Sequence, residues 1–160
     1  MSRYYVALGS NMGDRLAYLR AALRELKESG ATVVRASAVY ETPPWGKTDQ
    51  PAFLNAVALV ESDLAPADFL ALLQTIEAAN ERTRDVHWGP RTLDLDIIYA
   101  EGVQCDSAYL TLPHPYFWER AFVLVPLRDV AAGFTYRGET IAHRIAALPD
   151  AAAIRKVATL

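Results

Sequence analysis

Hydrophobic and polar residues recur with two different periods along this chain, and these periods predict its helices and strands. Residues 4–8 form a short apolar run, typical of a buried strand, that stops at the turn residues Gly9-Ser10-Asn11. Leucines then recur at three- and four-residue spacing, which predicts a helix over 15–28 that stops at Gly30. The chain therefore opens with a strand, a turn and a helix.

The rest of the chain continues this alternation. The expected elements are strands over 32–41, 53–61 and 93–100, a helix over 66–83, a hairpin through Gly102, and helices over 119–130 and 141–147. The order strand, helix, strand, strand, helix, strand is the pattern of a ferredoxin-like α+β sandwich, in which helices cover one face of a mainly antiparallel sheet. We expect residues 1–160 to form a single domain.

Charge and composition argue against several classes of function. The net charge of -3 disfavours a general nucleic-acid or membrane-surface binder, which would carry a basic excess. Cys105 is the single cysteine, so no intramolecular disulfide can form, as suits a reducing compartment. The sequence shows neither an apolar signal core at its start nor an apolar run long enough to span a bilayer. We therefore expect a cytoplasmic protein without nucleic-acid or membrane partners.

Two aspartates one residue apart are the most informative chemical feature. Asp94 and Asp96 lie in the predicted strand 93–100, and since successive strand side chains point to opposite faces, both carboxylates leave the sheet on the same side. At about 6 to 7 Å they repel each other by about 2 to 3 kcal/mol at an effective dielectric constant of about 20. Mg²⁺ would compensate this repulsion, because it is usually held by one or two carboxylates together with substrate phosphates.

Arginines just upstream favour phosphate as the other ligand. Arg82, Arg84 and Arg91 precede the aspartates, and guanidinium groups bind phosphate with paired hydrogen bonds. The alternative is an exposed face of an edge strand, on which alternating Asp and Leu only separate water from core. We favour a functional site, because aspartate is rare in strands and the turn Trp88-Gly89-Pro90-Arg91 leads directly into this one.

Other features could contribute to a site, and each has a structural alternative. Asn55 lies in an apolar strand, where its amide suits the edge of a guanine-like or pterin-like ring, or else bonds nearby backbone. Gln74 and Glu77 share one helix face, which is solvated in the alternative. His114 lies between two prolines and could donate to a phosphoryl group or be idle. The turn Gly9-Ser10-Asn11 could bind an anion or be only a turn.

Five motifs occur in order along residues 3–130. They are Ala7-Leu8-Gly9-Ser10-Asn11, Thr42-Pro43-Pro44, Phe53-Leu54-Asn55-Ala56, the segment 82–96, and Pro113-His114-Pro115 with Arg120. In this order they resemble the 6-hydroxymethyl-7,8-dihydropterin pyrophosphokinase family of folate biosynthesis. The resemblance implies a ferredoxin-like α+β fold and transfer of the β,γ-pyrophosphoryl unit of ATP to the pterin hydroxymethyl group, with release of AMP.

The resemblance also implies roles for individual residues, with Asp94 and Asp96 holding two Mg²⁺ ions. The implied catalytic residues are Arg82, Arg91, Asp94, Asp96 and His114; those for ATP are Gln74, Glu77, Arg84, Trp88, Ile97, His114, Tyr116 and Arg120; those for the pterin are Thr42, Pro43, Trp45, Phe53, Asn55, Asp94 and Phe122. The chain departs from several relatives at His87, where they carry arginine, and at Trp45, where they carry a smaller apolar residue. The expected partners are ATP and 6-hydroxymethyl-7,8-dihydropterin, and the expected state is a monomer.

Two other functions fit part of the sequence. A Mg²⁺-dependent nucleotidyl transferase or phosphohydrolase would use the same carboxylate pair, but it would leave Asn55 and the Pro-rich aromatic loop before it unexplained. A regulatory module that binds a nucleotide or pterin could share the fold, which hosts many functions, but it would not need both aspartates. The products formed from ATP distinguish the three hypotheses.

Overall fold

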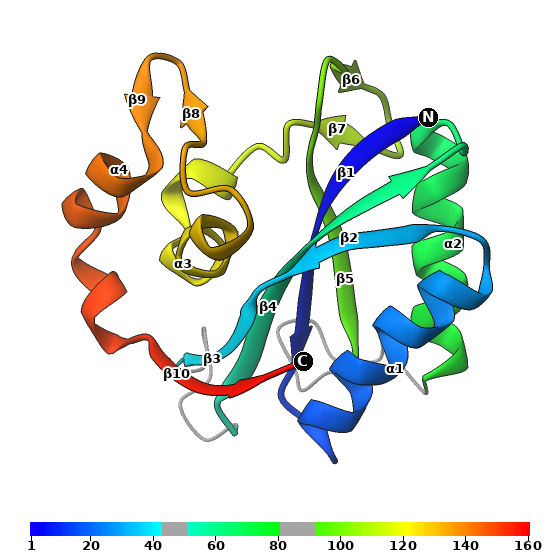
Figure 1. The fold of residues 1–160 in the computed structure, drawn as a ribbon, viewed down its shortest axis with the longest axis horizontal. Coiled ribbons are helices and arrows are strands. Elements are labelled where there is room, and N and C mark those ends of the chain that lie inside the picture. The colour runs from blue at the N-terminus through cyan, green and yellow to red at the C-terminus, as the bar shows by residue number, and fades with distance from the viewer. Residues whose placement is uncertain (43–50, 81–91) are drawn as a thin grey trace.

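The computed structural model describes residues 1–42, 51–80 and 92–160, and its centre is an antiparallel sheet (Figure 1). The strands of this sheet are β1 (Ser2–Ser10), β2 (Thr32–Ala36), β3 (Ala38–Thr42), β4 (Phe53–Ser62), β5 (Asp94–Ala100) and β10 (Arg155–Thr159). They lie in the order β10-β3-β4-β1-β5, and β2 also pairs with β4. Each neighbouring pair is antiparallel, so the ferredoxin-like α+β prediction is confirmed.

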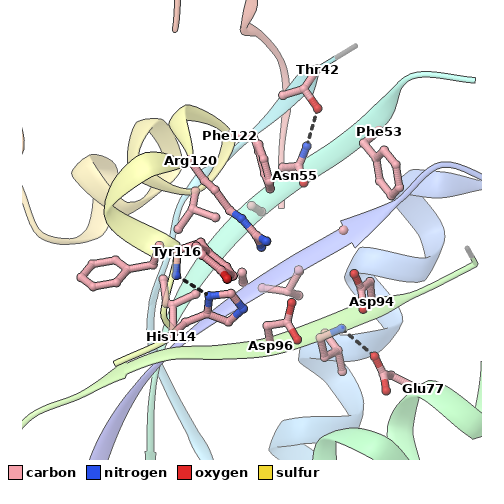
Figure 2. A pocket seen from close by; sticks show the side chains of 18 of the residues that line it. Thr42, Phe53, Asn55, Glu77, Asp94, Asp96, His114, Tyr116, Arg120 and Phe122 are labelled. Atoms are coloured by element: carbon pink, nitrogen blue, oxygen red, sulfur yellow. Dashed lines mark hydrogen bonds between the residues drawn. The ribbon is translucent and has the colours of Figure 1, made fainter. Parts of the chain in front are cut away.

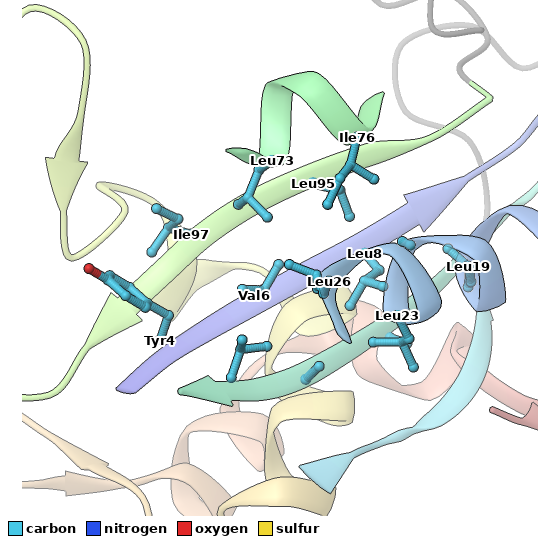
Figure 3. Packing of buried hydrophobic residues seen from close by; sticks show 14 of the residues in the cluster. Tyr4, Val6, Leu8, Leu19, Leu23, Leu26, Leu73, Ile76, Leu95 and Ile97 are labelled. Carbon is cyan, nitrogen blue, oxygen red and sulfur yellow. The ribbon is translucent and has the colours of Figure 1, made fainter. Parts of the chain in front are cut away.

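Two helices, α1 (Arg15–Glu28) and α2 (Pro66–Ala79), cover one face of the sheet (Figure 1). Their apolar stripes build the larger core cluster: Leu19, Leu23 and Leu26 of α1 share it with Val6 and Leu8 of β1 (Figure 3). These leucines are the ones that the sequence spacing assigned to a buried helix face. Within the described residues, no helix has the length and apolar character needed to cross a bilayer.

A third helix, α3 (Ala121–Val130), covers the opposite face, so the prediction of helices on one face only is wrong (Figure 1). On this face Tyr5, Val57 and Leu59 form a second core cluster with Leu124 and Leu127 of α3. The reason is the strand period: β1 and β4 are apolar on both faces, so a second layer must cover the face that α1 and α2 leave open. The sheet is therefore packed on both faces.

Short elements connect this framework. They are β6 (Cys105–Asp106), β7 (Thr111–Leu112), the 3₁₀ turn η1 (Phe117–Glu119), β8 (Thr135–Tyr136), β9 (Glu139–Thr140), α4 (Ile141–Ala147) and the 3₁₀ turn η2 (Pro149–Ala153). Trp118 joins several of them: its Nε1 donates to Glu139 Oε1 at 2.9 Å, and Arg144 Nε donates to the Trp118 carbonyl at 2.7 Å. The C-terminal hairpin and α4 therefore support η1 from outside.

Three boundaries differ from the sequence prediction. The strand expected over 32–41 is broken at Ser37, whose hydroxyl accepts from the Val57 amide at 2.9 Å in place of a regular ladder bond. Helix α2 ends at Ala79 rather than near residue 83, because the Asn80 side chain donates to the Ile76 carbonyl at 2.8 Å. The Ala-rich tail, for which no strand was expected, forms β10, which pairs with β3 and becomes the edge strand of the sheet.

We expect replacement of Leu26 by Ala to lower the free energy of unfolding by about 2 to 5 kcal/mol, because its fully buried side chain would leave a cavity under α1. Urea denaturation followed by circular dichroism measures this loss. Leu64→Ala is the matched control, since Leu64 is 39% exposed, and it should cost less than about 1 kcal/mol. Equal losses in the two variants would contradict the packing described for α1.

Candidate active site

A cavity of about 730 Å³ lies over neighbouring residues of β1, β4 and β5, on the face that α3 partly covers. This volume is within the usual range for small-molecule sites. Most of the predicted site residues that the structure describes line it: Thr42, Phe53, Asn55, Gln74, Glu77, Asp94, Asp96, His114, Tyr116, Arg120 and Phe122. In Figure 2 the strand residues Asn55, Asp94 and Asp96 lie across the cavity floor, with His114, Tyr116 and Arg120 of the segment before α3 beside them.

The floor of the cavity is the end of β1, where the side chains are small. Gly9 pairs in register with Asn55 of β4 on one side and with Asp94 of β5 on the other, and Ala7 pairs with Asp96. Directly opposed residues of antiparallel strands share a face, so Asn55 and Asp94 point to the same side at a separation of about 10 Å, two strand spacings. A planar ligand could lie over Gly9 between an amide and a carboxylate.

Asp94 and Asp96 lie on the same face of β5, as the alternation of a strand requires. Both are half-buried and line the cavity, whereas the side chain of Leu95 between them is 3% exposed in the core on the opposite face. Within the described residues, no group of three or more His, Cys, Asp or Glu side chains could hold a metal ion. A cation here would therefore take two carboxylates from this part of the chain and its remaining oxygen ligands from substrate and water.

Glu77 fixes the backbone between these two aspartates. Its side chain is buried at 3% exposure, and its Oε2 accepts a hydrogen bond from the Leu95 amide at 2.8 Å (Figure 2). The alternative of a solvated helix face is wrong for this residue. The contact reaches from α2 to the backbone between Asp94 and Asp96, so Glu77 holds this part of β5 in place.

Asn55 and Thr42 form a buried polar pair at the other flank of the cavity. Asn55 is 8% exposed and Thr42 is 4% exposed, and the Asn55 Nδ2 donates to Thr42 Oγ1 at 2.8 Å (Figure 2). A Cβ added at Gly9 would lie 3.3 Å from Asn55 Oδ1, closer than such contacts usually come. The amide oxygen of Asn55 therefore depends on glycine at position 9 for its place.

His114 and Arg120, from the segment between β7 and α3, form another wall of the cavity. The His114 amide donates to the Ile98 carbonyl of β5 at 2.9 Å, and its Nδ1 accepts from the Tyr116 amide at 3.2 Å. With Nδ1 as acceptor, a neutral imidazole carries its proton on Nε2 and can donate it. Burial and the nearby Arg120 cation lower the pKa of His114 from 6.5 to about 4, against the opposing effect of Asp94. His114 is therefore a neutral donor at pH 7.

Arg120 is held between two aromatic rings. Its guanidinium carbon lies 5.7 Å from the ring centroid of Tyr116 and 5.7 Å from that of Phe122. Figure 2 shows its guanidinium group pointing into the cavity, toward the side on which His114 and Asp96 lie. A cation aimed at this space can attract an anionic group of a ligand.

Not every predicted residue is part of this arrangement. Ile97 does not line the cavity; its side chain is 3% exposed in the core under α2, so any contact with a ligand would have to come from its backbone. Six predicted residues, and the departure at His87, lie outside the described residues: Pro43, Trp45, Arg82, Arg84, Trp88 and Arg91.

The cavity also has lining residues that the sequence did not indicate. Tyr109, on the loop between β6 and β7, is 85% exposed and still lines the cavity, and Glu119 of η1 lines it beside Arg120. No local pattern marks either residue. They reach the cavity because β7 lies beside β5 and the His114 amide, just after β7, donates to the Ile98 carbonyl of β5.

Comparison with known proteins gives matches along nearly the whole chain. A sequence model of the 7,8-dihydro-6-hydroxymethylpterin-pyrophosphokinase (HPPK) family matches residues 5–132. The 2-amino-4-hydroxy-6-hydroxymethyldihydropteridine pyrophosphokinase of Methylorubrum extorquens is 45% identical over 158 residues, which cover 98% of this chain and 99% of that protein. The protein of the same name from Bacillus subtilis is 46% identical over 127 residues, covering 79% of this chain and 76% of that protein.

A solved structure shares the fold. The crystal structure described as HPPK-DHPS in complex with substrates superposes with a TM-score of 0.70 at 12% sequence identity, over 92% of this chain. This chain spans 45% of that longer chain. At such low identity the likeness concerns the arrangement of helices and strands, which agrees with the sheet order described above.

We expect His114 to titrate near pH 4 in the ligand-free protein treated with a chelator, because burial and Arg120 disfavour its protonation. Since the unfolded chain takes up this proton near pH 6.5, the contribution to stability is fully present above pH 6.5 and is lost as the pH falls toward 4. NMR of the imidazole carbon-bound protons measures the midpoint, and His114→Asn assigns the signal. A midpoint at or above 6 would contradict the described environment.

We expect Glu77→Ala to lower the free energy of unfolding by about 1 to 3 kcal/mol, because the Leu95 amide loses its acceptor in a buried position. Chemical denaturation measures the change. Glu77→Gln keeps an oxygen acceptor at this position and should lose clearly less. If the two variants lose the same amount, the hydrogen bond to Leu95 is not what holds Glu77 in place.

Proposed function

This chain belongs to the 7,8-dihydro-6-hydroxymethylpterin-pyrophosphokinase family, and from this premise we propose how its described residues bind two substrates and transfer pyrophosphate between them. The activity is transfer of pyrophosphate to hydroxymethyldihydropterin in folate synthesis. One observation supports the assignment of roles below: Asn55 and Asp94 flank Gly9 in a single cavity. The pterin ring would lie between them, with its hydroxymethyl group toward Asp94.

We propose that Thr42, Phe53, Asn55 and Phe122 bind the pterin. Asn55 already donates to Thr42, so its amide orientation is set before the ligand arrives, and its Oδ1 can accept from an N–H on the ring edge. Phe53 and Phe122 line the cavity on two sides of this amide and can cover the faces of a flat ring. A preset amide lowers the entropy cost of binding a ring with fixed polar edges.

We propose that Asp94 and Asp96 hold two Mg²⁺ ions together with phosphate oxygens of ATP. The donor set fits, because two carboxylates on one strand face with substrate phosphates are the ligands that Mg²⁺ prefers. When bound, the ions neutralise phosphate charge and favour ionisation of the pterin hydroxyl. The buried Glu77 would keep the two carboxylates aligned through the Leu95 backbone.

We propose that the wall formed by the segment from His114 to Arg120, beside β5, binds ATP. His114 would donate from Nε2 to a phosphoryl oxygen, and the Arg120 cation, held between Tyr116 and Phe122, would bind the charge that moves during transfer. Gln74, on the cavity side of α2, would contribute a polar contact to the nucleotide. The roles of the six residues outside the described part of the chain stay predictions.

In the proposed reaction the pterin hydroxyl oxygen attacks the β-phosphorus of ATP. The bond from this phosphorus to the oxygen bridging the α-phosphorus breaks, AMP leaves, and the hydroxyl proton is released. Such a transfer needs positioning and charge neutralisation rather than a covalent enzyme intermediate. The neutral His114 and the Arg120 cation supply these without a strong base.

We also propose that residues 1–160 act as one domain, as a monomer, in the cytoplasm. The support for a monomer is that a single chain supplies both flanks and the floor of the cavity. The support for the cytoplasm is the lone cysteine, which suits a reducing compartment.

We expect the protein, mixed with ATP, Mg²⁺ and 6-hydroxymethyl-7,8-dihydropterin, to form AMP only when the pterin is present, as measured by chromatography. Asp94→Asn and Asp96→Asn should each lower kcat/KM by about 100-fold or more, because each removes a charged metal ligand. Asp63→Asn, a change at an exposed carboxylate in the turn after β4, is the matched control and should keep wild-type activity.

The products also test the two rival functions. ADP in place of AMP would indicate transfer of a single phosphoryl group or hydrolysis. Tight binding of ATP and pterin by the wild type without turnover would indicate a regulatory module. A chelator should abolish AMP formation and added Mg²⁺ should restore it; full activity in the chelator would contradict the proposed metal site.

A further inference from the structure

Arg15, outside the cavity, contacts both the end of β3 and the residue just before β4. It is the first residue of α1, and its Nη1 lies 3.1 Å from Glu41 Oε2 and 2.8 Å from the Ala52 carbonyl oxygen. Glu41 immediately precedes Thr42, and Ala52 immediately precedes Phe53. One guanidinium nitrogen therefore bridges the residues next to two proposed pterin contacts.

The strand register explains how a residue behind the sheet can act on the cavity in front of it. Thr42 pairs with Phe53 and Glu41 pairs with Leu54. Since side chains alternate, Thr42, Phe53 and Asn55 face the cavity, while Glu41 and Leu54 face the α1 side. Arg15 and Glu41 do not line the cavity, so any effect of theirs on a ligand must pass through the backbone of residues 42 and 53.

Neighbouring contacts hold the same corner of the fold. Asn11 Nδ2 donates to the Pro51 carbonyl at 3.3 Å, and Arg155 Nη2 of β10 donates to the other Glu41 oxygen at 3.0 Å. Arg155 is 74% exposed, whereas Arg15 and Glu41 are 30% and 24% exposed. The Arg15–Glu41 pair is thus the better shielded of the two, and screening by water should weaken the Arg155 contact more.

We propose that Arg15 is a positioning residue for the pterin subsite: its bridge between Glu41 and Ala52 fixes Thr42 and Phe53, and through Thr42 the amide of Asn55. The ATP side is built from other elements, β5 and the segment from His114 to Arg120, which Arg15 does not contact. Loss of the bridge should therefore weaken binding of the pterin and leave binding of ATP unchanged. This inference rests on the proposed function.

The test is steady-state kinetics of the full chain, varying one substrate at a time. Arg15→Met should raise the KM for the pterin by about tenfold, the effect of about 1.4 kcal/mol of lost binding, with the KM for ATP and kcat within about twofold of wild type. Titration of the pterin by fluorescence, with α,β-methylene-ATP present, should show the same loss of affinity. The KM split is a readout that a general loss of stability would not produce.

Arg15→Lys tests the bridge itself. Both contacts are made by one nitrogen, so a single ammonium group can occupy the same place, and the KM for the pterin should recover to within about threefold of wild type. A lysine variant as impaired as Arg15→Met would overturn the bridging role. Arg24→Met is the matched control: it removes an arginine from the same helix whose contact with Glu28 is exposed, and it should change neither KM.

Glu41→Gln keeps the proposal testable if Arg15→Met does not fold, because it removes the ion pair with little change of shape. It should raise the KM for the pterin in the same selective way, and thermal unfolding of each variant checks that the fold is retained. Equal rises in both KM values, or no rise, would overturn the proposal. A wild type that forms no AMP would instead overturn the proposed function, so the two failures are distinguishable.

Discussion

The position of β1 between β4 and β5 is the constraint on which the site depends. Backbone hydrogen bonds of two antiparallel ladders put Gly9 opposite both Asn55 and Asp94, and Ala7 opposite Asp96. A shift of either ladder by one residue would turn the amide or the carboxylates into the core. The apolar residues of β1 resist that shift, because Val6 and Leu8 face α1 while Tyr5 faces α3. Core packing on both faces thus fixes the spacing of the polar groups at the end of the sheet.

The polar groups of the site are held by hydrogen bonds within the protein that are already present without a ligand. Glu77 holds the backbone between the aspartates from α2, Thr42 holds the Asn55 amide, and the Tyr116 amide holds the His114 ring. Each contact fixes the orientation of a side chain or backbone segment before a substrate binds. This lowers the entropy cost of ordering the site on binding. Arg15 acts less directly, because it contacts Glu41 and Ala52 at the strand ends rather than a side chain of the site.

The C-terminal part of the chain, beyond the residues that the family model matches, has a supporting role in this design. Glu139 and Arg144 bind Trp118 and so support η1, which lies between His114 and Arg120. Strand β10 completes the edge beside β3, and its Arg155 reaches Glu41. These C-terminal residues thus support both η1 and β3, although they do not line the cavity themselves.

The sequence by itself determined what local periods encode. The leucine spacing gave the buried face of α1, the alternation in residues 93–100 put Asp94 and Asp96 on one side, and the order of elements gave the ferredoxin-like sheet. Tertiary structure decided what depends on segments far apart in the chain: the helix on the second face, the strand formed by the tail, the buried role of Glu77 and the bridge made by Arg15. The physical reason is that a period within one segment fixes which face a side chain takes, whereas the partner it meets there is set by register and packing between segments, which no local pattern carries.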